Sequence, residues 1–373
     1  MKKCIKCSLT EGRYNVVLNE EGVCNYCDYF ETNMGDIVNF EQNEAVFIRR
    51  FEQNKGKYEY DALCGLSGGK DSSYVLYQLV EKYKLNVLAV TYDNGFITDF
   101  TRNTINKIVN KLGVEHYWYK PNWDIHKRLY KRSIEKYGDP CIACAFVGFF
   151  LSFKVCYEKQ IPFFVHGRTP QQMFKNFYIG CKDMFFPIIK ANLSEHSFEL
   201  LSKVNGFANE GMKRFVSSLA ISADEAKEFI DEFFIDTAKM TSEFTAEFLA
   251  YFLFERYNEE KMKNKLREVF DWVEHPGESL LGHNDCAINA AASYFFKELH
   301  GVDVLEREVG ARIRLGETDK EQGAAAIEAS QPSSEVLNNS MDEISRLCDC
   351  NREDLDKTIL NLKEAGIPMF SSR

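Results

Sequence analysis

The sequence lacks any long hydrophobic run. No window of its 373 residues contains the run of about 18 uninterrupted apolar residues that a membrane-spanning helix requires. The first residues, which include Lys2, Lys3 and Lys6, have no apolar core of the kind that signal peptides carry. The sequence therefore predicts a cytoplasmic protein with no membrane segment.

An excess of positive charge is also lacking. The chain has 46 Lys and Arg residues against 56 Asp and Glu residues, which gives a net charge of −10. Such a balance provides no global field that would collect nucleic acid by counterion release. A protein that binds nucleic acid through overall charge is thereby excluded, although a local basic patch is not.

Cysteine, in contrast, is abundant, with 12 residues in the chain. Disulfides do not persist in the reducing cytoplasm, so these cysteines are expected to be metal ligands, reactive thiols or core residues. Four of them, Cys4, Cys7, Cys24 and Cys27, form the spacing C-x2-C-x16-C-x2-C. This spacing is typical of a zinc ribbon, and four thiolates leave no open coordination position, so the site is predicted to be structural.

The fold class follows from the alternation of short apolar strands with helices. Strands are predicted at 61–66, 86–92, 115–119 and 161–166, with helices at 100–112, 124–136 and 143–159 between them. This order predicts an α/β protein with a doubly wound parallel sheet. We predict four regions: a zinc ribbon at 1–33, the α/β domain at 34–190, a helical insertion without strands at 191–275, and a C-terminal helical region at 276–373.

A glycine loop follows the first predicted strand directly. It comprises Ser67, Gly68, Gly69, Lys70, Asp71 and Ser72. A strand that turns through glycines into a helix gathers backbone N–H groups around one small volume, which is an anion site. The residues do not fit the template G-x-x-x-x-G-K-[ST], since Cys64 and Asp71 occupy two of its required positions.

This loop resembles the pyrophosphate loop of the N-type ATP pyrophosphatases (the PP-loop, HUP-type superfamily), over about residues 59–190. The resemblance implies that ATP is cleaved between its α and β phosphates and that a substrate carbonyl is adenylated. It implies that the six loop residues hold the pyrophosphate, with Asp71 also a partner for Mg²⁺. It also implies that the strand with Val90 and Tyr92 binds adenine through backbone groups. After the fourth strand, Gly167 and Arg168 stand where many relatives that modify tRNA carry Gly-His-Asn; Arg168 is either a ligand of the α-phosphate or a surface residue.

A second C-x-x-C motif, Cys141 and Cys144, lies where a loop enters a helix. Thiols at a helix N-terminus have lowered pKa values. In relatives that move sulfur, such a pair plus a third cysteine resembles the ligand set of a [4Fe-4S] cluster, and we prefer Cys286 over Cys181 as the third ligand. A redox dithiol and a second zinc site with His283 are the alternatives. Cys64 and Cys156 are expected in the core, and Cys348 and Cys350 on the surface.

Further residues with two interpretations are Asp93, His166 and His283. Asp93 is either a turn residue or a catalytic one, and each histidine is either a proton-transfer group or a structural one.

Three functions are consistent with these motifs. The preferred one is an ATP-dependent sulfur transferase; the alternatives are an ATP-dependent amidotransferase similar to the N-acetyl-sugar amidotransferases of surface-glycan biosynthesis, and a non-catalytic nucleotide-binding protein. Two short basic runs favour tRNA as the acceptor: Lys2, Lys3, Lys6 and Arg13, and Lys120, Lys127, Arg128, Lys131 and Arg132. Acidic residues between 210 and 232 oppose it, so we expect a small-molecule or carrier-bound acceptor, with tRNA left open. A donor protein for sulfur or ammonia and a homodimer are also left open.

Overall fold

A five-stranded parallel sheet forms the centre of the protein, in a computed structural model that describes residues 2–33, 40–169, 172, 198–241, 243–274 and 286–367. The strand order is β3-β2-β1-β4-β5. The strands are β1 (Ala62–Gly65), β2 (Val87–Tyr92), β3 (Glu115–Tyr119), β4 (Phe163–His166) and β5 (Glu247–Ala250). Because the chain moves outward from β1 to β3 and then returns to β4 on the other side, the direction of winding reverses between β1 and β4. Ligands of doubly wound sheets bind at such a point.

The two faces of the sheet follow the alternation of side chains along each strand. On β1, Ala62 and Cys64 face one apolar cluster, which also contains Phe47 and Phe51. Leu63 faces the opposite cluster. Helices α2 (Phe40–Asn54), α3 (Lys70–Tyr77), α4 (Asp99–Leu112) and α11 (Glu259–Phe270) cover the first face, and α6 (Pro140–Lys159) covers the second. The predicted α/β fold with a doubly wound parallel sheet is confirmed.

Capping residues set the bounds of the helices that lead to and from the sheet. Thr98, Asn122 and Asp139 accept backbone hydrogen bonds at the starts of α4, α5 (Trp123–Tyr137) and α6. Gly113 and Gly138 end α4 and α5 with φ values of +65° and +64°, a conformation that favours glycine. A five-residue π-helix, η1 (Gln78–Lys82), continues α3.

The segment 191–275 is not purely helical, which corrects the expectation of an insertion without strands. It contains α9 (Phe198–Ser217), α10 (Ala223–Phe233), the 3-10 turns η2 (Thr237–Lys239) and η3 (Tyr251–Leu253), and also β5. Strand β5 pairs with β4 in parallel, from Phe163 with Glu247 to His166 with Ala250. The sequence signal is weak because a strand of four residues among helix-forming segments shows no period of its own.

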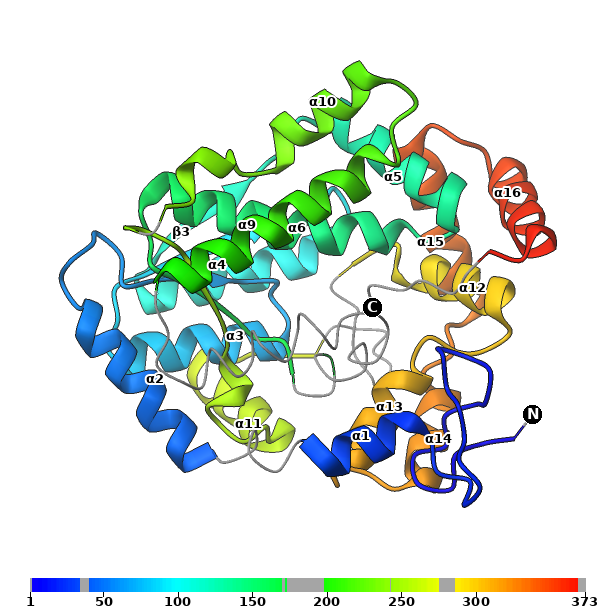
Figure 1. Cartoon of the computed structure of the whole chain (residues 1–373), viewed down its shortest axis with the longest axis horizontal. Helices are drawn as coiled ribbons and strands as arrows, with labels where there is room; N and C mark the ends of the chain where they lie inside the picture. The colour runs from blue at the N-terminus through cyan, green and yellow to red at the C-terminus, as the bar shows by residue number, and fades with distance from the viewer. Residues whose placement is uncertain are drawn as a thin grey trace.

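The N-terminal residues pack against the C-terminal helices (Figure 1). The helices in contact with these residues are α12 (Asn289–His300), α13 (Glu306–Arg314) and α14 (Lys320–Ala329), while α15 (Ser334–Cys348) and α16 (Arg352–Ala365) pack against α12 and α5. Residues 2–33, which we call the ribbon, contain two short antiparallel bridges and α1 (Asn25–Asn33). Tyr14 of the ribbon stacks on Phe296, and its hydroxyl donates to the carbonyl oxygen of Asp303 at 2.8 Å. The two ends of the chain therefore share one apolar cluster.

One helix, α6, is long and apolar enough to cross a membrane by its length and composition. Most of its apolar window is buried within the protein, against the sheet and α9. Core helices have the same composition, so α6 is explained by its place against the sheet.

Candidate functional site

The glycine loop occupies the carboxyl end of β1, where the winding of the sheet reverses. Gly68 has φ of +85°, and a Cβ there would lie 2.9 Å from Cγ2 of Thr101 and 3.0 Å from Cγ1 of Ile105. Both the backbone conformation and the approach to α4 therefore require glycine. Gly69 is the N-cap residue of α3 and makes no side-chain cap. The first N–H groups of α3 are thus left to face the loop, as an anion site requires.

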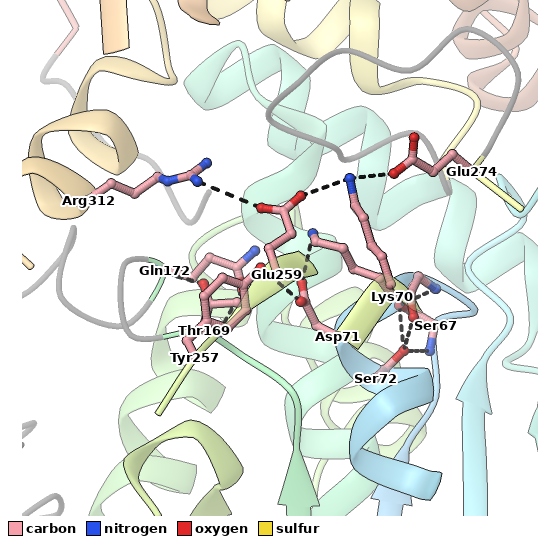
Figure 2. Close-up of polar contacts among 12 residues, drawn as sticks. Ser67, Lys70, Asp71, Ser72, Thr169, Gln172, Tyr257, Glu259, Glu274 and Arg312 are labelled. Atoms are coloured by element: carbon pink, nitrogen blue, oxygen red, sulfur yellow. Dashed lines mark hydrogen bonds and ion pairs between the residues drawn. The ribbon is translucent and has the colours of Figure 1, made fainter. Parts of the chain in front are cut away.

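Two serines fix the shape of this loop. The hydroxyl of Ser72 accepts from the backbone N–H of Ser67 at 3.1 Å and lies 3.1 Å from the hydroxyl of Ser67. It can also donate to the carbonyl oxygen of Gly69 at 3.3 Å. The motif thus folds into a closed loop held by its own side chains (Figure 2).

The segment after β4 forms the other wall. A Cβ on Gly167 would lie 2.9 Å from the backbone nitrogen of Ser72, so the two loops meet backbone to backbone. The Nδ1 atom of His166 accepts from the backbone N–H of Arg168 at 2.9 Å. Its ring stacks on Phe248 with 3.8 Å between centroids, and burial lowers its pKa well below the ordinary value. This contact gives His166 a structural role, while Arg168 is exposed and lies over the ring of Phe149.

Lys70 and Asp71 form an ion pair of 3.3 Å at the start of α3. The hydroxyl of Tyr257 donates to Oδ1 of Asp71 at 3.2 Å. Burial raises the pKa of Asp71, and the charge of Lys70 opposes this rise. Burial also opposes the charged form of Lys70, but the carboxylates of Asp71 and Glu259 outweigh it and raise the pKa of Lys70. The loop therefore presents a cation beside a partly desolvated acidic side chain.

Sequence reasoning missed a group of residues from the C-terminal half that surrounds this pair. Figure 2 shows Glu259 between the loop and Arg312. Glu259 pairs with Lys263 at 3.0 Å, and Lys263 pairs in turn with Glu274. These residues belong to α11, its flanks and α13, regions whose charged residues look like ordinary solvated helix faces in the sequence. No motif spacing links them to the loop.

The second C-x-x-C motif lies on the first turn of α6. Asp139 caps this helix by accepting from the backbone N–H of Cys141 at 2.7 Å, and Pro140 takes the first helical position. The side-chain amide of Asn94 donates to Sγ of Cys144 at 3.6 Å. Both cysteines are partly exposed, so the motif is accessible at the positive end of the α6 dipole.

The structure brings Cys286 to the same place. Cys286 pairs through an antiparallel bridge with Ile97, in the loop that follows β2. Cys144 and Cys286 both pack against the apolar cluster that contains Phe96 and Tyr130. In the parts of the chain that the structure describes, these sulfurs do not come close enough together to share one ion. Ligands of an iron–sulfur cluster stand farther apart, since irons and sulfides lie between them. Cys181 and His283 lie outside the described residues.

Asp93 and β2, the strand predicted to bind adenine, have well-defined partners. Asp93 pairs with Arg102 at 3.1 Å and accepts from the N–H of Gly95 at 3.4 Å, the geometry of a turn residue. The carbonyl oxygen of Val90 accepts from Leu66 at 2.8 Å, at the edge of the loop. The side chain of Tyr92 points away from the loop, toward His126 and the surface of α6. Any contact of Tyr92 with a nucleotide would thus use its backbone.

The four ribbon cysteines fit a single metal ion. Four sulfurs at about 2.3 Å from one zinc ion are about 3.8 Å apart. The sulfurs of Cys4 and Cys27 are 3.9 Å apart, those of Cys7 and Cys24 are 3.5 Å apart, and all four are buried. Backbone N–H groups of Lys6 and Cys24 donate to Sγ of Cys4. Hydrogen bonds from the other three thiols lower the pKa of Cys4.

A buried arginine complements this donor set. Arg314 of α13 lies over the ring of Tyr26, and its two terminal nitrogens are buried without a hydrogen-bond partner. Hydrogen bonding to Cys24 raises the pKa of the Cys7 thiol, and the charge of Arg314 opposes that rise. Four thiolates around a divalent ion carry a net charge of −2, which a nearby cation stabilises. The residues therefore fit a divalent metal.

For the remaining cysteines, the prediction is correct for the two core thiols and wrong for Cys348. Cys64 and Cys156 lie in the core, as expected, and burial raises the pKa of each. Cys348 is not a surface thiol: it is buried beside Tyr130, and burial raises its pKa to about 12. It occupies the apolar face of α15, which the charged composition of that region conceals. Cys350 is partly exposed.

Three cations of the basic run on α5 have acidic partners in the structure. Lys127 pairs with Asp349, and Arg128 pairs with Glu228 and with Glu225 at 3.1 Å. Arg132 pairs with Glu135 at 2.6 Å. Glu225 and Glu228 of α10 thus form ion pairs with Arg128, which would otherwise be available to phosphates.

Comparisons with known proteins find similar solved structures but no matching family model or curated protein. Among solved structures, the chain is similar to the U34-tRNA thiolase NcsA from Methanococcus maripaludis with its [4Fe-4S] cluster, at 14% identity, over 94% of this chain and 89% of that one. The TM-score is 0.36, and at that level the likeness carries no argument about function.

Proposed function

We propose that this protein is an ATP-dependent, AMP-forming transferase that replaces a carbonyl oxygen of its acceptor with sulfur. The observation that carries the proposal is that the glycine loop and the segment after β2 follow adjacent parallel strands and so lie at the same edge of the sheet. The glycine loop after β1 packs through Gly68 against α4. In the segment between β2 and α4, Ile97 forms an antiparallel backbone bridge with Cys286, and the side-chain amide of Asn94 donates to Sγ of Cys144.

The loop is suited to the polyphosphate of ATP. It presents the N–H groups at the start of α3, the hydroxyls of Ser67 and Ser72, and the ammonium group of Lys70. The close approach of Gly167 leaves backbone groups at the opposite wall. Asp71 would hold Mg²⁺, which neutralises the charge that develops on the departing pyrophosphate.

The reaction that we propose has two displacements. The acceptor's carbonyl oxygen forms a bond to the α-phosphorus of ATP, and the bond between the α-phosphorus and its bridging oxygen breaks, so that pyrophosphate leaves. A sulfur nucleophile at the oxidation level of hydrosulfide then attacks the carbonyl carbon, and AMP leaves with its oxygen. Adenylation lowers the second barrier because AMP is a far better leaving group than oxide. No electrons are gained or lost.

The environments of the two cysteine groups suggest which metal each group binds. We propose zinc in the ribbon, where four buried sulfurs have tetrahedral spacing. We propose that Cys141, Cys144 and Cys286 would hold a [4Fe-4S] cluster, which supplies a site for sulfide when bound. Their partial exposure favours access by a sulfur donor. The acidic partners of three cations in the basic run of α5 favour a small-molecule or carrier-bound acceptor over tRNA.

Nucleotide binding is tested by calorimetry with ATP and Mg²⁺. We expect Asp71→Ala to remove the Mg²⁺-dependent part of the binding. Asp99→Ala is the matched control, because Asp99 is also an acidic residue in the first turn of a helix at this edge. A protein that binds no ATP, or an Asp71→Ala variant that binds it normally with Mg²⁺, would contradict the proposal.

The sulfur step is tested by analysis of iron, zinc and acid-labile sulfide in anaerobically prepared protein. We expect about four irons and four sulfides per chain, lost together in Cys144→Ser and retained in Cys350→Ser. A colourless protein without iron that still forms AMP with ammonia, and whose Cys144→Ser variant is active, would be an amidotransferase instead.

A further inference from the structure

Helix α13 lies between the ribbon and the glycine loop and presents different residues to each. Gly310 faces the ribbon, where a Cβ would lie 3.1 Å from Cγ of Leu9 and 3.4 Å from the carbonyl oxygen of Cys7. Arg307 lies over the ring of Tyr14, and Arg314 lies over the ring of Tyr26. These three positions are spaced by three and four residues and so share one face of the helix.

Arg312 lies on the other side of α13 and reaches toward the loop. Its NH2 atom is 3.7 Å from Oε2 of Glu259, and its Nε atom is 3.7 Å from Oε2 of Glu317. The Nε atom is buried and has no hydrogen-bond partner. Figure 2 shows the Arg312 side chain extended toward Glu259, on the side of the loop.

Glu259 is close to the residues that would bind the phosphates. It follows Tyr257 by two positions, and the hydroxyl of Tyr257 donates to Asp71 at 3.2 Å. The charge of Glu259 contributes to the raised pKa values of both Lys70 and Asp71, so its field reaches the loop. A carboxylate in this position repels a polyphosphate unless a cation offsets it.

We propose that α13 makes the ribbon a part of the nucleotide site: the metal-bound ribbon holds α13 in place, and Arg312 then joins Lys263, which pairs with Glu259 at 3.0 Å, in neutralising Glu259 beside the phosphates. This inference rests on the proposed binding of ATP at the loop. Arg312 is a positioning residue, which acts on the β and γ phosphates through Glu259. The rigid contacts of Gly310 with Leu9 and Cys7 fix where Arg312 stands.

The experiment measures the affinities of ATP and AMP for four proteins: wild type, Arg312→Gln, Glu259→Gln and the double variant. We expect Arg312→Gln to weaken ATP binding about tenfold and AMP binding less than twofold, because AMP lacks the two distal phosphates. Glu259→Gln should bind ATP at least as tightly as wild type. The double variant should return to within about threefold of wild type, since the repelling charge is then gone.

Arg346→Gln is the control, because Arg346 is an exposed arginine that pairs with Glu343 on α15. Two outcomes would overturn the inference: Arg312→Gln binding ATP like wild type, or losing ATP and AMP equally with no recovery in the double variant. The second outcome would show a purely structural role. Absence of ATP binding by wild type would instead overturn the proposed function on which the inference rests.

Discussion

The two cysteine groups of this protein use the same C-x-x-C spacing and have different environments. The ribbon sulfurs are buried and lie within 4.8 Å of one another, and the charge of Arg314, whose terminal nitrogens are buried, acts on Cys7. Cys141, Cys144 and Cys286 are partly exposed and come from two segments, the first turn of α6 and the bridge at Cys286; an amide donates to Cys144, and Cys144 and Cys286 pack against an aromatic cluster. Spacing alone therefore predicts metal affinity, while burial distinguishes a closed structural site from an open one.

The largest expected difference between the groups is in stability. Cys7→Ser should lower the free energy of unfolding by on the order of 5 kcal/mol, a part of the binding energy that structural zinc contributes to folding. Cys144→Ser should lower it by about 1 kcal/mol or less, since its site is partly exposed. Chemical unfolding monitored by circular dichroism, with zinc content measured in parallel, checks both. Equal losses would mean that the second group is structural as well.

A change at the interface of the ribbon with α13 should affect the nucleotide site from a distance. Gly310→Val pushes α13 away from Leu9, so we expect ATP binding to weaken about fivefold through displacement of Arg312. Gly206→Val is the matched control, because Gly206 is also helical and a Cβ there meets nothing within 4 Å. Calorimetric titration with ATP measures this affinity. An unchanged affinity in a folded Gly310→Val protein would show that the ribbon does not influence the glycine loop.

The region of the second cysteine group should also be sensitive to acid. Burial lowers the pKa of His126 to about 3, against about 6.5 in an unfolded chain. The unfolded state therefore binds more protons at acidic pH, and stability falls as the pH drops below about 6.5. Between pH 7 and pH 5 this one histidine should cost about 2 kcal/mol.

His300, beside the ribbon, offers the comparison. Burial lowers its pKa to about 4, so its full effect in strong acid is smaller than that of His126. We expect the pH dependence of unfolding between pH 7 and pH 3 to flatten more in His126→Phe than in His300→Phe. Urea unfolding at several pH values measures this, and the reverse order would show that the ribbon side is the acid-sensitive one.

The smallest expected effect concerns the basic run of α5. Arg128 pairs with the exposed Glu228 and with the buried Glu225; because the arginine itself is open to solvent, we expect the pairs to contribute about 0–1 kcal/mol. Arg128→Gln should therefore change the free energy of unfolding by less than about 1 kcal/mol and leave ATP affinity unchanged. A larger loss, seen by urea unfolding, would mean that α5 and α10 depend on this pair to dock beside the second cysteine group.

The sequence predicts the parts of the fold that local patterns encode. Strands β1 to β4 are apolar runs that end in loops, and Gly68 is recognisable because its motif is continuous. Strand β5 is too short to show a period, and Cys348 lies on the buried face of a charged helix. Contacts of Tyr257 with Asp71 bridge 186 positions, and no local signal indicates them. The candidate site was therefore predictable on its loop side and not on the side of α11 and α13.

The packing of the ribbon against the C-terminal helices has a consequence for synthesis on the ribosome. Tyr14 finds its hydrogen-bond partner 289 positions later in the chain, and Phe296 and Val302, which complete the same apolar cluster, are also made late. The nascent ribbon must therefore remain soluble through most of translation without its partner helices. Metal capture by its four cysteines is a local event that can proceed at once, and it would protect these thiols from oxidation until the last helices emerge.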